Sequence, residues 1–314
     1  MKRVILLALV VLLLVLLLSS EKSNYSDNKK IAINQSLQGV HSEMCLHAIE
    51  YCKNRNIEFQ VFDSGQQTWK NFMEKKYDIK IKDPKELNGE EFTHVINLTN
   101  GSPVNNNGTK LISIEHCIDG KGYPDEITIH PTKNGTDWFL PLYSLYPISE
   151  TKWEGNNIAC LGDGGSFYST DLVSKLKDVT FHVVLHNDDS EWRKVAIETA
   201  KSLQNSQVHV GIDLIELAEV LKKCNYFLFI NGGFNKDAPK YKNECFPALI
   251  QIAWGCGASI ITTTELINAW PDILSDEINI DTITELPTVD PEVNYAKYQK
   301  FSKMRDDMYD KFTE

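Results

Sequence analysis

Short apolar runs alternate with segments of helical periodicity from residue 30 onward, and this alternation restricts the possible folds more than any other feature of the sequence. Residues 31–34 and 57–62 have the length and composition of strands, and between them residues 41–54 carry apolar side chains at helical spacing. Residues 226–230 are apolar at every position, which is typical of a strand buried on both faces. The alternation therefore predicts an α/β protein whose parallel sheets are covered by helices on both faces.

The alternation falls into two series, separated by residues 131–147, an aromatic stretch that contains three prolines. We expect one α/β domain at residues 30–150, a second at residues 151–292, and a charged helix at residues 293–314. The further strands expected are residues 93–98 and 110–114 in the first series and residues 158–161, 179–185, 208–210 and 258–261 in the second, with helices at residues 169–176, 190–204, 214–223, 246–254 and 264–274.

The charge balance of the chain is acidic. Its 314 residues include 43 Asp and Glu against 32 Lys and Arg, a formal net charge of −11. Nucleic-acid binders gain much of their affinity by neutralising phosphates, so this balance argues against that class. The 42% of apolar and 24% of charged residues are ordinary for globular proteins and exclude a long coiled coil, a polytopic membrane protein and a wholly disordered chain.

The first twenty residues depart from this average. Lys2 and Arg3 precede fifteen unbroken apolar residues at positions 4–18, the pattern of a signal anchor or a signal peptide. As a helix the run reaches about 22 Å, against roughly 30 Å for a bilayer core. We expect a type II single-pass membrane protein with a lumenal or external body and a stem at residues 21–29, or a secreted protein if residues 1–20 are cleaved.

The Asn-X-Ser/Thr sequons of the chain are consistent with a lumenal, glycosylated body. The chain has six Asn-X-Ser/Thr sequons, of which Asn24, Asn107 and Asn134 lie in polar stretches and are the candidates for glycosylation. Asn97 closes an apolar strand and is expected to be too buried for modification. The seven cysteines include no close pair of the metal-binding type, and we expect them to be mainly free and buried.

A glycine-rich loop follows the first strand of the second series. It comprises Gly162, Asp163, Gly164 and Gly165. Glycines let backbone N–H groups approach an anion, and the N-terminus of a following helix favours negative charge. The loop does not match the dinucleotide-binding pattern, so a plain turn is the alternative.

A second loop combines an acid, a helix start and basic residues. Glu244, Cys245, Phe246 and Pro247 precede the predicted helix at residues 246–254, and Pro is common at the first helical positions. A carboxylate here can accept hydrogen bonds from sugar or ribose hydroxyls, while the helix dipole favours a diphosphate. Lys236, Lys240 and Lys242 could add positive charge, or they could form a solvated basic loop.

The segment that begins at Glu244 resembles the C-terminal domain of GT-B glycosyltransferases, especially the family-4-like group (glycosyl transferases group 1). In that group a Glu is followed eight positions on by a second Glu, then by a Cys-Gly pair and an apolar strand. Glu244 takes the first position and Cys256 with Gly257 takes the Cys-Gly position, but Ile252 stands where the second Glu belongs. The departure implies either that the donor is gripped differently or that catalysis is lost.

The resemblance implies two Rossmann-like domains, with a nucleotide-sugar donor bound by the second and no metal bound by the protein. The helix at residues 293–314 would cross back to the first domain. Gln38, Gly39 and His41 resemble the acceptor-side loop, and His41 could act as a base on an acceptor hydroxyl. The implied catalytic residues are His41 and Glu244. The implied donor-binding residues are Gly162, Asp163, Gly164, Gly165, Lys236, Lys242, Glu244, Cys245, Phe246 and Pro247.

Two other functions remain open on the sequence. Asn187, Asp188 and Asp189 follow a predicted strand and could hold Mg²⁺ or Mn²⁺ in a GT-A-like, metal-dependent transferase, or could cap the next helix. A non-catalytic, GT-B-like sugar-binding protein is the alternative favoured by Ile252. The partners expected are a nucleotide sugar, a glycan, protein or lipid acceptor, and a membrane contacted through residues 4–18.

Overall fold

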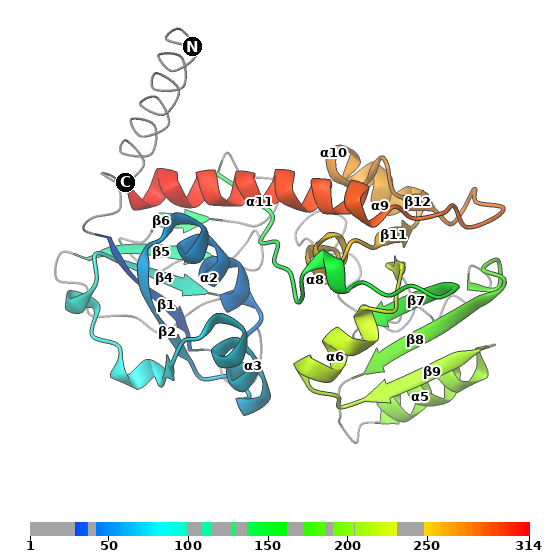
Figure 1. Cartoon of the computed structure of the whole chain (residues 1–314), viewed down its shortest axis with the longest axis horizontal. Coiled ribbons are helices and arrows are strands. Elements are labelled where there is room, and N and C mark those ends of the chain that lie inside the picture. Colours follow the sequence, from blue (N-terminus) through cyan, green and yellow to red (C-terminus); the bar gives the residue numbers. More distant parts are fainter. Residues whose placement is uncertain are drawn as a thin grey trace, which may run out of the picture.

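The computed structural model describes residues 29–36, 42–98, 109–114, 127–129, 137–161, 173–185, 191–203, 205–230 and 248–314. They form two α/β domains, each built on a six-stranded sheet in which all the strand pairings are parallel (Figure 1). The predicted fold class is confirmed.

The first sheet has the strand order β3-β2-β1-β4-β5-β6. Its register is continuous through the centre, with Ile33 of β1 opposite Val61 of β2 and Ile96 of β4. The strands are β1 (Lys30–Gln35), β2 (Glu58–Asp63), β3 (Ile81–Lys82), β4 (His94–Leu98), β5 (Lys110–Ile114) and β6 (Ile127–Ile129), joined by α2 (Met44–Arg55), α3 (Gln67–Tyr77) and the 3₁₀ helices η1 (Pro84–Glu86) and η2 (Gly89–Glu91).

The second sheet has the order β12-β11-β10-β7-β8-β9. Numbered within their own domain, both sheets have the order 3-2-1-4-5-6 of a doubly wound fold. The strands are β7 (Asn156–Leu161), β8 (Val179–Leu185), β9 (Ser206–Val210), β10 (Tyr226–Leu228), β11 (Ser259–Thr262) and β12 (Ile278–Asn279). The helices are α5 (Glu191–Ser202), α6 (Leu214–Leu221), α8 (Ala248–Ala253), η4 (Trp254–Cys256), α9 (Thr264–Ala269), α10 (Pro271–Leu274) and α11 (Pro291–Thr313), with η3 (Ile148–Glu150) between the domains.

Local signals explain where several helices begin and end. The Asp213 carboxylate accepts from the backbone N–H of Glu216 at 2.9 Å, and the Glu216 carboxylate accepts from the N–H of Asp213, so α6 begins with a capping box. The single helix expected at residues 264–274 is instead two. Pro271 lacks an N–H and cannot continue α9, so it occupies the first turn of α10.

The helix α11 connects the two domains along one side of the molecule (Figure 1). Near its start, the Asn294 side chain donates to the carbonyl oxygen of Gly257 in the second domain at 3.1 Å. Near its end, the hydroxyls of Tyr51 in α2 and Thr313 lie 2.8 Å apart. One hydrophobic core cluster extends from β1 through this helix to α6 and α8, so the domains share buried apolar surface.

The expected single-pass membrane protein is corrected by the structure. Among the described residues no helix has the length and apolarity needed to cross a bilayer. Residues 4–18, on which that expectation depended, lie outside the described part, as do Asn24, Asn107 and Asn134.

Candidate functional site

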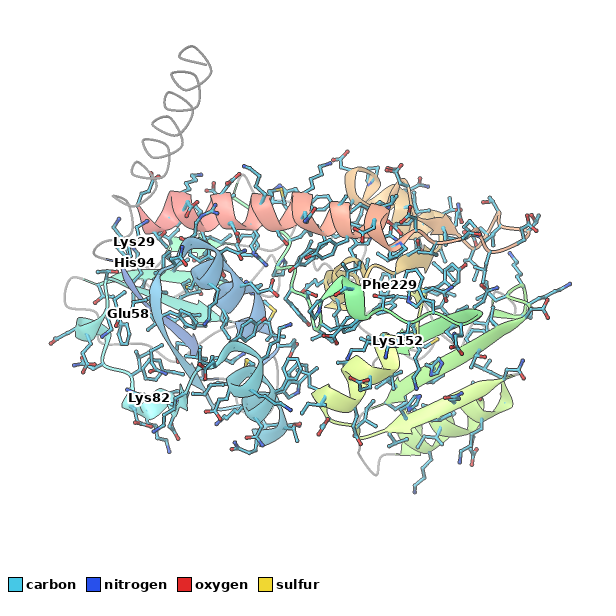
Figure 2. The ribbon with its side chains drawn as sticks, in the orientation of Figure 1. Lys29, Glu58, Lys82, His94, Lys152 and Phe229 are labelled. Carbon is cyan, nitrogen blue, oxygen red and sulfur yellow. The ribbon has the colours of Figure 1, made fainter. Side chains whose placement is uncertain are left out.

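The carboxyl ends of the two sets of strands face the space between the domains. In Figure 1 the arrowheads of β8 and β9 point toward the first domain, and that of β4 points toward the second. Ligands of open α/β sheets bind beyond the carboxyl ends of the strands. Phe229, labelled in Figure 2, is buried at the carboxyl end of β10 and donates its backbone N–H to Ile261 at 2.8 Å. This interdomain edge is therefore the candidate functional site.

A buried carboxyl group marks the edge in the first domain. Asp63, the last residue of β2, is fully buried, and its Oδ1 accepts from the Ser42 hydroxyl at 3.1 Å and from the Gly65 N–H at 2.9 Å. Its Oδ2 has no hydrogen-bond partner among the described residues. Burial raises the pKa of Asp63 above its ordinary value, and the hydrogen bonds from Gly65 and Ser42 only partly oppose that shift.

Gly65 permits this arrangement. A Cβ at Gly65 would lie 1.5 Å from the Ser42 Oγ, so any side chain here would displace the Ser42 hydroxyl from Asp63. The contact brings the turn after β2 against the residues that precede α2. Because Ser42 directly follows His41 in the chain, the buried carboxyl lies beside the sequence position of the expected base.

A row of neutral polar residues crosses the first sheet, and each of them is the penultimate residue of its strand. Asn34 of β1 pairs in register with Asn97 of β4, which pairs with Ser113 of β5, which pairs with Thr128 of β6. The Asn34 amide donates to the Asn97 Oδ1 at 2.8 Å. Strands buried in parallel sheets are usually apolar, so four polar residues in one row are a departure that suits hydrogen bonding near the edge. Asn97 is fully buried, as expected.

In the second domain, the 3₁₀ helix η4, which directly follows α8, lies against residues 143–147, which we call the linker between the domains. The Ser144 hydroxyl donates to the carbonyl oxygen of Gly255 at 3.0 Å. A Cβ at Gly255 would lie 2.6 Å from the carbonyl oxygen of Tyr143, so glycine is required for this close approach. Ile252 is 7% exposed and belongs to the core cluster shared by the domains, so a Glu at this position would be buried among apolar side chains.

A buried cluster centred on Glu50 holds α11 and the linker against the first domain. The Glu50 Oε1 accepts from the Ser144 N–H at 3.0 Å and from the Tyr77 hydroxyl at 3.3 Å. Its Oε2 accepts from the Tyr298 hydroxyl at 2.7 Å and from the Arg305 Nη1 at 3.2 Å. We call these five residues the Glu50 cluster. It joins α2, α3, the linker and α11, and so sets the relative position of the elements that carry the two strand edges.

The cysteines and the metal-ligand types give no further site in the described part. Five thiols, each buried and unpaired, are described, and burial raises their pKa; that of Cys256 reaches about 12. Within the described ranges, no three His, Cys, Asp or Glu side chains gather as potential metal ligands.

Comparison with known proteins supports the architecture. No family model matches the sequence, and a search of curated proteins gives no significant match. Two solved structures resemble the chain along most of its length. AviGT4, a glycosyltransferase involved in avilamycin A biosynthesis, superposes with a TM-score of 0.52 at 10% identity, covering 90% of this chain and 92% of its own. Anabaena Alr3699/HepE, solved in complex with UDP and glucose, gives 0.52 at 10% identity, covering 91% and 95%.

The chain has a GT-B fold. At 10% identity the similarity establishes the fold alone. In a GT-B fold, two Rossmann-like domains face each other across a cleft, which agrees with the opposed carboxyl ends described above.

Most residues that the sequence singles out lie outside the described part of this GT-B chain. Ile252, Cys256 and Gly257 are the exceptions. The segments concerned follow described elements: residues 37–41 follow β1, residues 162–165 follow β7, and residues 231–247 precede α8. The residues outside the described part are Gln38, Gly39, His41, Gly162, Asp163, Gly164, Gly165, Asn187, Asp188, Asp189, Lys236, Lys240, Lys242, Glu244, Cys245, Phe246 and Pro247.

Sequence reasoning missed Asp63 and the Glu50 cluster. Asp63 carries a signal, since an acid followed by Ser-Gly stands directly after a predicted strand at the edge where ligands bind. Glu50 carries none, because it reads as an ordinary charged residue of an amphipathic helix. Its partner Arg305 is 255 residues away, and only the tertiary fold brings them together.

Proposed function

We propose that the chain is a glycosyltransferase that moves a sugar from a nucleotide-sugar donor to an acceptor in the cleft between its two domains. The observation that carries this proposal is the pair of doubly wound sheets whose carboxyl ends face each other, bridged by α11. In such sheets the carboxyl ends bind ligands, so opposed edges present a donor and an acceptor to one another. The neighbours AviGT4, a glycosyltransferase, and HepE, solved with UDP and glucose, share this fold.

In this proposal the nucleotide-sugar donor binds to the second domain, residues 151–292. Glu244 accepts hydrogen bonds from sugar or ribose hydroxyls, and the residues that follow it lead into α8. Lys236 and Lys242 add positive charge for the diphosphate, and Gly162 to Gly165 offer backbone N–H groups after β7. Catalysis then depends on positioning and on electrostatic stabilisation of the leaving diphosphate. We also propose that the transferase is of the family-4-like type that the segment from Glu244 resembles.

The acceptor binds to the first domain, residues 30–150, in the same proposal. His41 takes the proton from an acceptor hydroxyl, and Gln38 and Gly39 contact the acceptor. Support comes from Asp63, a buried carboxyl group hydrogen-bonded to Ser42, the residue after His41. The row from Asn34 to Thr128 supplies further neutral polar groups near the same edge.

The test begins with a thermal-shift screen of nucleotide sugars on the full chain, followed by a transfer or donor-hydrolysis assay with the donor that binds. Glu244→Gln is expected to lower the rate at least tenfold while the melting temperature stays unchanged. Glu198→Gln is the matched control, since Glu198 is exposed on α5 and its substitution should leave the rate unchanged. An unchanged rate in Glu244→Gln would remove Glu244 from the site.

A non-catalytic sugar-binding protein with the same fold is the second candidate. The observation that favours it is the buried Ile252 in place of the family's second Glu. Binding of a nucleotide sugar without transfer to any acceptor would support this candidate, and transfer would exclude it.

A metal-dependent mechanism that uses Asn187, Asp188 and Asp189 predicts loss of transfer with EDTA and its recovery with Mn²⁺ or Mg²⁺.

A further inference from the structure

A cavity lies between the domains, with a volume of about 1070 Å³. Its lining comes from α2, α3, the linker and η3, α6 and α11, so both domains contribute. The cavity is wide enough for a drug-sized organic molecule. No role in the proposed transfer uses it.

In the first domain, the cavity lies away from the strand edge that forms the candidate site. Its first-domain lining includes Asn54 and Arg55 at the end of α2 and Lys76 and Tyr77 at the end of α3. The chain continues from these helix ends into the amino ends of β2 and β3. Helices that connect parallel strands run back toward the amino ends, so this cavity is on the opposite side of the first sheet from the carboxyl edge.

The carboxylates that line the cavity all have partners. Glu50 accepts from four donors, as described above. Glu150 and Glu219 pair with Lys222 at 2.8 Å and 2.6 Å, and Asp306 accepts from the Asn54 amide at 3.0 Å. Each of these lining carboxylates therefore already has a hydrogen-bond or ion-pair partner.

Three lining lysines have no carboxylate partner among the described residues. Lys53 and Lys75 are exposed at the rim. Lys76 lies deeper, donates to the carbonyl oxygen of Ser144, and has its ammonium 5.8 Å from the ring centre of Phe72. Burial lowers the pKa of Lys76, and the nearby charges of Glu50 and Glu150 only partly oppose that shift. Because an ammonium has three donors, Lys76 can bind an anion and keep its bond to Ser144.

The same cavity presents apolar and aromatic surface from both sides. Phe72 and Tyr77 come from α3, and the stacked rings of Tyr295 and Tyr298 come from α11, with their centres 5.2 Å apart. Ile215 of α6 is 43% exposed, although large apolar side chains are usually buried. Unpaired ammonium groups beside aromatic surface suit a ligand that is both anionic and apolar.

We propose that this cavity binds an organic anion with a flat apolar body, separately from the nucleotide-sugar cleft. The ammonium groups of Lys53, Lys75 and Lys76 hold the anionic group, and the aromatic residues with Ile215 cover the apolar body. Because the ligand touches α3 in the first domain and α6 in the second, its binding couples to their relative position. A ligand that favours one arrangement of the domains thereby changes affinity in the cleft.

The probe is 8-anilinonaphthalene-1-sulfonate, an aromatic sulfonate whose fluorescence reports binding, titrated into the folded full chain. Saturable binding at one site is expected, and Lys75→Glu should weaken it at least tenfold. Lys177→Glu is the matched control, because Lys177 is an exposed lysine of the second domain that does not line the cavity. An unchanged melting temperature and unchanged binding of the neutral dye Nile red show that a weakened variant is still folded.

Ile215→Gln tests the contribution of the second domain and should weaken the probe several-fold. Val195→Gln is its control, since Val195 is similarly exposed on α5, outside the cavity. Saturating UDP should leave the probe bound. The proposal is overturned if no saturable binding occurs, or if both lysine variants weaken binding equally. It is also overturned if UDP displaces the probe in proportion to the UDP bound, because the probe would then lie in the cleft.

Discussion

Replacing Glu50 by Gln tests how strongly the Glu50 cluster holds the domains together. The substitution keeps the size of the side chain but turns one acceptor oxygen into an NH₂ donor. The Glu50 side chain is 13% exposed, and all four groups that face it are donors. The two tyrosine hydroxyls can rotate to accept. The backbone N–H of Ser144 and the guanidinium of Arg305 cannot, so either orientation of the amide leaves two donors facing each other.

The cost follows from these contacts. Losing the charge-assisted bond to Arg305 costs about 1.5–3 kcal/mol, and leaving a buried donor without an acceptor costs about 1–3 kcal/mol more. Together they give about 2.5–6 kcal/mol, and we take about 3–5 kcal/mol, the range for breaking a buried ion pair. At about 2–4 °C per kcal/mol for a chain of roughly this size, the melting temperature should fall by about 6–20 °C.

The assay is thermal unfolding followed by circular dichroism. Glu219→Gln is the control, because Glu219 also pairs with a lysine but its side chain is 62% exposed, and such pairs contribute little. The control should melt with the wild type. A fall of less than about 2 °C for Glu50→Gln would refute the reasoning, since it would mean that the cluster contributes no net stability.

Two further predictions concern the strand edges. Ile252→Glu should destabilise the protein and fail to tighten nucleotide-sugar binding, because the new carboxylate would be buried. The melting temperature of this variant should fall more at pH 8 than at pH 5, because the ionised carboxylate is the form that burial disfavours. The control Ile252→Val should cost only about 0.5–1.5 kcal/mol at either pH. Tighter binding by Ile252→Glu would contradict this placement. Asp63 has a raised pKa in the folded protein, so it costs stability as pH rises from the ordinary value of 3.8 through the raised one. The melting temperature of Asp63→Asn relative to wild type should therefore increase over that interval, and a difference that shrinks with rising pH would show that the buried carboxylate is stabilising.

The fold could be predicted because buried strands and their connections leave local patterns. The strands at residues 110–114 and 179–185 have the predicted limits, since each is a compact apolar run. The helix α3 was missed, because only Trp69, Phe72 and Met73 interrupt a largely polar segment. The edge strands β3 and β12 have two residues each, too few to show a period.

The candidate site was less accessible to sequence reasoning. Glycines, an acid before a helix and nearby lysines point to loops that bind a phosphate, but they do not show which loops meet. Asp63 was detectable as an acid after a strand. Its burial and its bond to Ser42 were not, because they depend on Gly65 allowing two separate turns to touch.

The sequence by itself determined the α/β class, the parallel sheets and the division into two series. The reason is that strand burial and helix periodicity produce patterns among a few neighbouring residues. Only the tertiary structure decided that the two sheets face each other, that Ile252 is in the shared core, and that Glu50 and Arg305 meet. It also revealed the cavity between the domains, whose lysines and aromatic rings come from helices far apart in the chain. These features depend on contacts between distant residues, and such contacts leave no periodic trace in a single sequence.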